Sequence, residues 1–102
     1  MIGGAGDAWF STRTSGAPEA LRCRVEKFFM GSSAPDLGSR LSQAGGAALT
    51  EATRADAGRA AALDLLAADA LITLALLLAA EQDPGRLGTT AAGLRRQATS
   101  TP

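Results

Sequence analysis

The longest apolar run in the chain lies between Ala60 and Ala80 and reads AAALDLLAADALITLALLLAA. Ala and Leu are strong helix formers, so we expect a helix. On a helical wheel the run forms two stripes on nearly opposite sides. The first stripe holds Leu63, Leu66, Ala67, Ala70, Leu71, Leu74, Leu77 and Leu78, and the second holds Leu65, Ile72 and Leu76. Because a helix that is apolar on two sides is buried between neighbours, we predict the central helix of a small all-α bundle of three or four helices.

Apolar periodicity and capping residues predict the other helices. Pro18 is suited to the start of a helix, and Asp36 and Asp56 are good N-cap residues. Asp83–Pro84 is expected to end one helix and begin the next. The predicted helices span residues 18–30, 36–53, 57–82 and 84–98. They form a helical domain over residues 17–98, between a flexible N-terminal arm at 1–16 and a tail at 99–102.

Two local structures stay open. Residues 8–28 contain an alternation of apolar and charged residues that also suits a β-hairpin, although the helical stripe through Phe28 and Phe29 favours a helix. The pair Gly45–Gly46 lies in the middle of the 36–53 helix, where each Gly costs about 1 kcal/mol relative to Ala. It therefore predicts either fraying or a break in that helix.

The glycine-rich N-terminus carries one aromatic pair, Trp9–Phe10. Such a pair either packs onto the domain or serves as an exposed anchor for a partner. The second stripe of the apolar run is likewise either internal core or a dimer seam. The sequence thus gives five candidate interface residues: Leu65, Ile72, Leu76, Trp9 and Phe10.

The composition disfavours several kinds of chemistry. Ten basic residues balance ten acidic ones, whereas nucleic-acid binding normally needs a basic surface. Histidine is absent and Cys23 is the single cysteine, so we expect no catalytic residues, cofactor or metal site. Asp64 and Asp69 lie about 140° apart on a helix and cannot act as an acid–base pair alone. We expect Asp69 to pair with an arginine such as Arg40 or Arg95, or to be exposed.

The apolar run also raises the alternative of a membrane-associated protein. A spanning helix needs roughly 20 apolar residues, and Asp69 would lie near the middle at a cost of roughly 2.5–3.5 kcal/mol. The uncharged stretch Ala70–Ala80 is too short to span a bilayer. With no N-terminal secretory pattern, we expect a cytoplasmic protein whose Ala-, Leu- and Arg-rich composition is typical of bacteria. The favoured function is a non-enzymatic helical interaction module that binds another helical protein or a second copy of itself.

Overall fold

The computed structural model describes residues 5–54, 58–82 and 92–96, and within these residues all regular structure is helical. The helices are α1 (Ala5–Thr14), α2 (Glu19–Met30), α3 (Leu37–Arg54) and α4 (Arg59–Gln82), and residues 92–96 are also helical. The all-α prediction is confirmed. Residues 8–28 form α1, a turn and part of α2, so the hairpin alternative is wrong.

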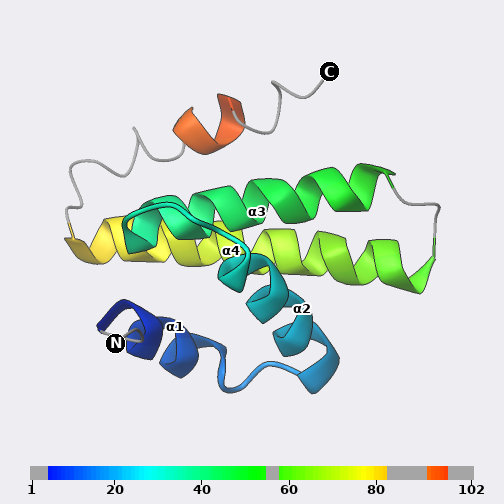
Figure 1. Cartoon of the computed structure of the whole chain (residues 1–102), viewed down its shortest axis with the longest axis horizontal. Coiled ribbons are helices and arrows are strands. Elements are labelled where there is room, and N and C mark those ends of the chain that lie inside the picture. The colour runs from blue at the N-terminus through cyan, green and yellow to red at the C-terminus, as the bar shows by residue number, and fades with distance from the viewer. Residues whose placement is uncertain (1–4, 55–57, 83–91, 97–102) are drawn as a thin grey trace.

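Helices α3 and α4 lie side by side along the long axis of the molecule and run in opposite directions (Figure 1). Helix α2 crosses in front of them and packs against both, while α1 lies beside the C-terminal part of α4. The core gathers between these helices. Its buried apolar residues are Phe10, Val25, Phe28, Phe29, Leu41, Ala44, Ala48, Ala67, Ala68, Leu71, Leu74, Ala75 and Leu78.

The close approach of α3 to α4 depends on Gly45. This residue is buried, and a Cβ atom built on it would lie 3.0 Å from Ile72 Cγ1 and 3.5 Å from Leu71 Cβ. A methyl group there would therefore crowd Ile72, whose side chain would have to shift. Helix α3 runs unbroken through Gly45–Gly46, which settles the open question about that pair. The propensity cost of glycine is offset by tight helix packing.

The helix starts follow local hydrogen bonding. Asp36 caps α3, because its Oδ2 accepts from the Ser39 N–H at 3.0 Å and its Oδ1 accepts from the Ser39 hydroxyl at 2.9 Å. These bonds lower the pKa of Asp36, as they favour the carboxylate. Pro18 lies just before α2 rather than inside it. Gly58 precedes α4 with φ of 152°, a conformation that favours glycine.

Three of the predicted helices match the structure closely. The predicted spans 18–30 and 36–53 agree with α2 and α3 to within about a residue, and 57–82 agrees with α4 from Arg59 onward. The predicted cap Asp56 and the Asp83–Pro84 junction lie outside the described residues. Of the predicted 84–98 helix, the structure describes residues 92–96, which are helical, and Leu94 there packs against the core.

The prediction of a flexible arm at residues 1–16 is wrong for residues 5–14, because they form α1. This helix is held by long-range side-chain contacts. The Phe10 ring stacks on Phe29 with centroids 3.9 Å apart, and the Arg40 guanidinium carbon lies 3.9 Å from the same Phe29 centroid. Arg40 Nη1 also bonds Asp7 Oδ1 at 3.1 Å. The segment has no apolar period of its own, so the contacts to α2 and α3 stabilise it.

Candidate functional site

The structure does not gather the five candidate interface residues on one surface, although Leu65 and Leu76 share one side of α4. Phe10 is a core residue, 4 % exposed, so its assignment to a surface is corrected. Trp9 is half-buried against the core, and Ile72 is half-buried where α4 faces Gly45 of α3. Leu76 is half-buried, and Leu65 is 55 % exposed. The second stripe is thus partly covered by this chain and partly open.

Helix α4 buries one side and leaves the other open. Its buried residues, Asp64, Ala67, Ala68, Leu71, Leu74, Ala75 and Leu78, share one side, which faces α2 and α3. The opposite side carries eight exposed or half-buried residues that we call the open face: Ala62, Leu65, Leu66, Asp69, Thr73, Leu76, Leu77 and Ala80. Leu66 and Leu77 are 52 % and 39 % exposed, although both belong to the first predicted stripe.

The open face departs from the predicted wheel because α2 and α3 cover a single broad sector of α4. That sector includes part of each predicted stripe. Sequence periodicity identified both groups of leucines but not which neighbours would cover them. No local sequence signal locates the covered sector, because the run contains both Asp64 and Asp69 and only the structure shows that Asp64 is the buried one.

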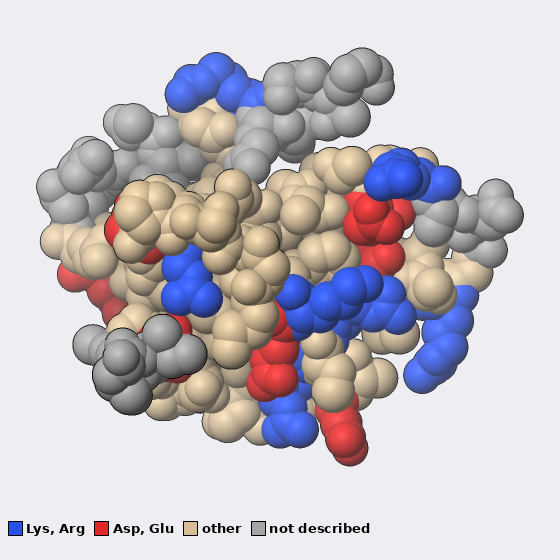
Figure 2. All heavy atoms as spheres, in the orientation of Figure 1, with Lys and Arg blue, Asp and Glu red and all other residues tan. Residues whose placement is uncertain are grey.

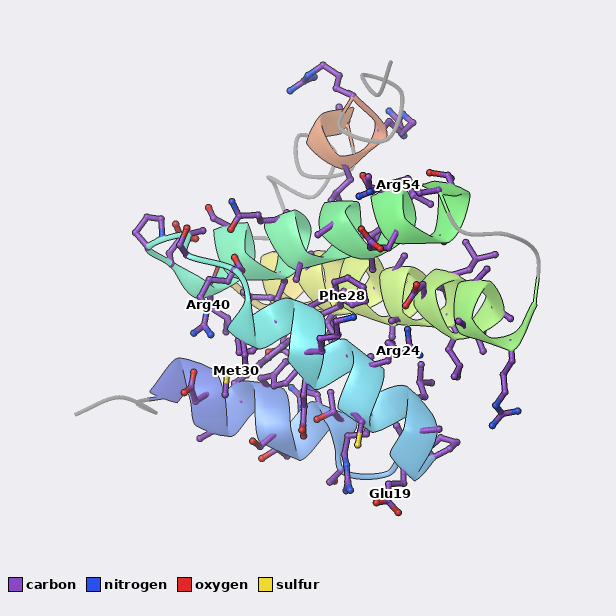
Figure 3. All side chains as sticks on the ribbon, turned by 45° about the vertical axis from the view of Figure 1, so that its right-hand side comes forward. Glu19, Arg24, Phe28, Met30, Arg40 and Arg54 are labelled. Atoms are coloured by element: carbon purple, nitrogen blue, oxygen red, sulfur yellow. The ribbon has the colours of Figure 1, made fainter. Side chains whose placement is uncertain are left out.

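Helix α4 buries one charged residue, Asp64. Asp69 is exposed, which is one of the two outcomes expected for it. Asp64 Oδ1 accepts from Arg24 Nη1 of α2 at 2.7 Å, and the Asp64 side chain is 7 % exposed against 26 % for Arg24. Figure 3 shows Arg24 on the side of α2 that faces α4. Arg40, an expected partner of Asp69, instead binds Asp7. This ion pair therefore fixes α2 to α4 and is a structural contact.

A second polar contact holds α1 to the end of α4. Glu81 accepts from the Trp9 indole N–H at 3.0 Å and from Arg13 Nη2 at 2.6 Å. Both bonds lower the pKa of Glu81, and the Trp9 bond is the larger cause. The Arg13 guanidinium carbon also lies 5.0 Å from the Trp9 ring centroid. Trp9 therefore packs onto the domain, which is one of the two alternatives predicted for it.

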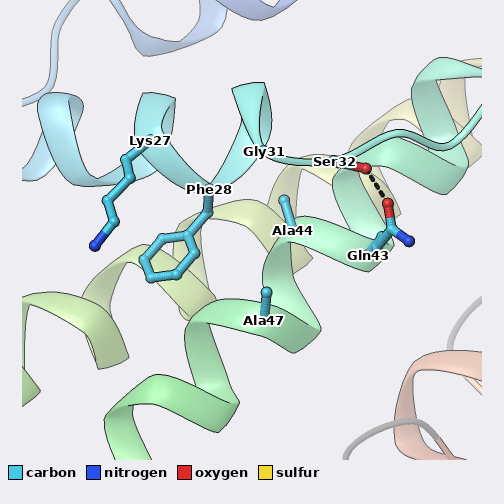
Figure 4. A pocket seen from close by; sticks show the side chains of 7 residues that line it. All are labelled: Lys27, Phe28, Gly31, Ser32, Gln43, Ala44 and Ala47. Carbon is cyan, nitrogen blue, oxygen red and sulfur yellow. Dashed lines mark hydrogen bonds between the residues drawn. The ribbon is translucent and has the colours of Figure 1, made fainter.

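One groove lies between α2 and α3 (Figure 4) and has a volume of about 250 Å³. Its lining residues are Lys27, Phe28, Gly31, Ser32, Gln43, Ala44 and Ala47. The Ser32 hydroxyl donates to the Gln43 carbonyl oxygen, and Lys27 Nζ lies 5.2 Å from the Phe28 ring centroid. Lys27 is the one ionisable side chain in this lining. Nothing in it pairs a nucleophile with a base.

Another groove of about 250 Å³ separates α1 and α2 from α4. Its charged lining residues are Arg13, Arg22 and Asp69, and Thr73 lies next to them. The groove shares Asp69 and Thr73 with the open face, so the two surfaces are continuous. Its lining comes from three helices, of which α4 is far in sequence from α1 and α2, so no local pattern predicts it. Among the described residues no group of three metal-ligating side chains occurs.

Charges of both signs are interspersed on the visible surface. Figure 2 shows basic and acidic side chains next to one another across the middle of this face, with uncharged residues around them. A uniformly basic surface, as a phosphate backbone would need, is not seen in this view.

Comparison with protein-family models, with curated proteins and with solved structures found no match for the chain.

Proposed function

We propose that the protein is a non-enzymatic helical interaction module and that the open face of α4 is its docking surface. One observation carries this proposal: Leu65, Leu66 and Leu77 are 55 %, 52 % and 39 % exposed on a helix whose other side is fully packed. Leaving large leucine side chains in water is unfavourable by about 25 cal/mol per Å² of apolar surface. Several exposed leucines gathered on one face of a helix are typical of a surface that a partner covers.

The shape of the surface favours a helical partner. The exposed leucines recur along α4 at spacings that place them on one side, and an amphipathic helix can lay its own apolar side against them. Balanced charges and the lack of histidine support a binding role over catalysis or nucleic-acid binding. The proposal includes a cytoplasmic location and a bundle organised around α4.

The test is photo-cross-linking in cells that make the protein. A photoreactive amino acid replaces Leu66 on the open face, and in the matched control it replaces Met30 of α2, which is 67 % exposed. We expect covalent adducts from position 66 and not from position 30. Equal labelling at both positions, or none at position 66, would refute a docking surface on α4.

The length and apolarity of α4 favour a second candidate, a membrane-associated protein. Among the described residues, α4 is the one helix long and apolar enough to cross a bilayer, and 39 % of its most apolar stretch is buried in the fold. Insertion would take Asp64 away from Arg24, and it would place Asp69 near the bilayer centre, where an Asp costs roughly 2.5–3.5 kcal/mol. Recovery of the protein in the soluble fraction without detergent would exclude this candidate.

A further inference from the structure

We propose that the partner of the open face is a second copy of the same chain, bound with the two α4 helices antiparallel. This inference rests on the proposed function, since it takes the open face as the docking surface. Its basis is that the open face has the same pattern in both directions. From Ala62 the residues are Ala, Leu, Leu and Asp, and back from Ala80 they are Ala, Leu, Leu and Thr, at identical spacings.

The pattern is symmetric about position 71, near the middle of α4. In a twofold dimer each contact must occur twice, with residue i meeting j and j meeting i. Two antiparallel α4 helices centred on position 71 satisfy this rule. Residues on the same edge of the open face then meet, at heights that agree to within one residue, or about 1.5 Å. The resulting contacts are Ala62 with Ala80, Leu65 with Leu76, Leu66 with Leu77, and Asp69 with Thr73, each pair taken between the two copies.

The lateral positions of the leucines agree with this pairing. Leu65 and Leu76 differ by about 20° around the helix axis, as do Leu66 and Leu77. Each pair therefore lies along one edge of the open face. The antiparallel arrangement brings Leu65 of one copy to Leu76 of the other on one edge, and Leu66 to Leu77 on the other edge. The exposed leucines are then covered in two rows that flank the centre.

The polar centre favours the same orientation. Asp69 and Thr73 make no side-chain hydrogen bond or ion pair within the described part of the chain. In the antiparallel dimer each Thr73 hydroxyl lies beside the Asp69 carboxylate of the other copy and can donate to it. Two equivalent bonds then give each Asp69 carboxylate one hydrogen-bond donor from the other copy. In a parallel dimer the two Asp69 carboxylates would face each other and repel.

The mass of the purified protein in solution is the first test. Sedimentation analysis over a concentration series is expected to show twice the chain mass of 10.3 kDa. Leu66→Glu should abolish the dimer and keep the helical circular dichroism spectrum, while the matched control Met30→Glu should remain dimeric. A wild-type mass of one chain at every concentration, or dissociation by both variants, would overturn the inference.

Cysteine cross-linking tests the orientation. In a Cys23→Ser background, Ala62→Cys and Ala80→Cys are expected to form a linked dimer when the two variants are mixed, and not when either is alone. In the antiparallel arrangement the two copies of position 62 are about 27 Å apart at 1.5 Å per residue, far beyond disulfide reach. Linkage of either variant with itself would overturn the antiparallel arrangement.

A charge substitution tests the polar centre. Thr73→Asp would place an additional carboxylate beside each Asp69 and should raise the dissociation constant by roughly tenfold or more. Adding Asp69→Lys to this variant should restore dimerisation through Lys–Asp pairs. If Thr73→Asp left the dissociation constant unchanged, Asp69 and Thr73 would not meet across the interface.

These tests separate the inference from the proposed function. If the purified chain is monomeric but position 66 cross-links to a different protein in cells, the second copy is wrong and the interaction module stands. If the chain is monomeric and position 66 gives no adduct, both are wrong.

Discussion

Removing either partner of the ion pair between α2 and α4 should lower the stability by a different amount. Arg24 and Asp64 share a 2.7 Å contact but are buried to different extents, with side chains 26 % and 7 % exposed. Arg24→Met keeps most of the aliphatic stem and leaves a carboxylate shut away from water. Asp64→Ala leaves a guanidinium on a long, partly exposed side chain that can turn toward water. The first variant should therefore be the less stable.

The difference in unfolding free energy follows from these exposures. Removing one partner of a buried ion pair costs about 3–5 kcal/mol when the other charge stays buried. The cost of Arg24→Met should lie near the lower end of this range, at about 3 kcal/mol, because the Arg24 side chain is partly exposed and water can approach the pair. Asp64→Ala should cost about 1 kcal/mol, the net value of a typical hydrogen bond. A gap of about 2 kcal/mol corresponds to roughly 8 °C or more in Tm for a domain of this size.

Urea unfolding is the assay, followed by helical circular dichroism and by Trp9 fluorescence so that two-state behaviour is checked. The double variant Arg24→Met/Asp64→Leu should come within about 1 kcal/mol of wild type, because an apolar pair can replace a buried ion pair. If Asp64→Ala is as destabilising as Arg24→Met, or the double variant is the least stable of the three, the burial argument fails.

Three further perturbations follow from the described contacts. Gly45→Ala gains about 1 kcal/mol of helix propensity but crowds Ile72, an effect worth about 1–3 kcal/mol, so a net loss is expected in thermal unfolding. Asp36→Ala should lose about 1 kcal/mol of capping. Because the folded pKa of Asp36 is lowered, this loss should be full above the unfolded value near 3.8 and should disappear as the pH falls through the folded pKa. Glu81 has a lowered pKa as well, so its hold on Trp9 is present above about pH 4.5 and is lost as the pH falls through the lower folded pKa. Tryptophan fluorescence should report this acid transition in the wild type and not in Glu81→Ala.

Much of the helical architecture could be predicted from local signals. The cap at Asp36 and the apolar stripe through Phe28 and Phe29 located α3 and α2 to within a residue or so. The Ala- and Leu-rich run located α4. These predictions succeeded because caps, propensities and periodicity act over a few residues and need no knowledge of neighbours.

The α1 helix and the open face could not be predicted in the same way. Helix α1 has few apolar residues in period, and its position depends on Phe10 meeting Phe29 and on Glu81 meeting Trp9, contacts far apart in sequence. The apolar run likewise contains two acidic residues, and its periodicity does not indicate which of them is buried. Only the packing of α2 against α4 decides that Asp64 is buried and Asp69 exposed.

The way α1 is attached implies that the molecule opens in parts. Helix α1 does not pack closely along its length against a neighbouring helix as α3 does against α4. Ion pairs of two of its side chains, Asp7 and Arg13, attach it to the domain. Local opening of such a segment needs less free energy than global unfolding. Backbone amides of α1 should therefore exchange with deuterium long before those of α4, and each opening event would unstack Phe10 and briefly wet the ring of Phe29.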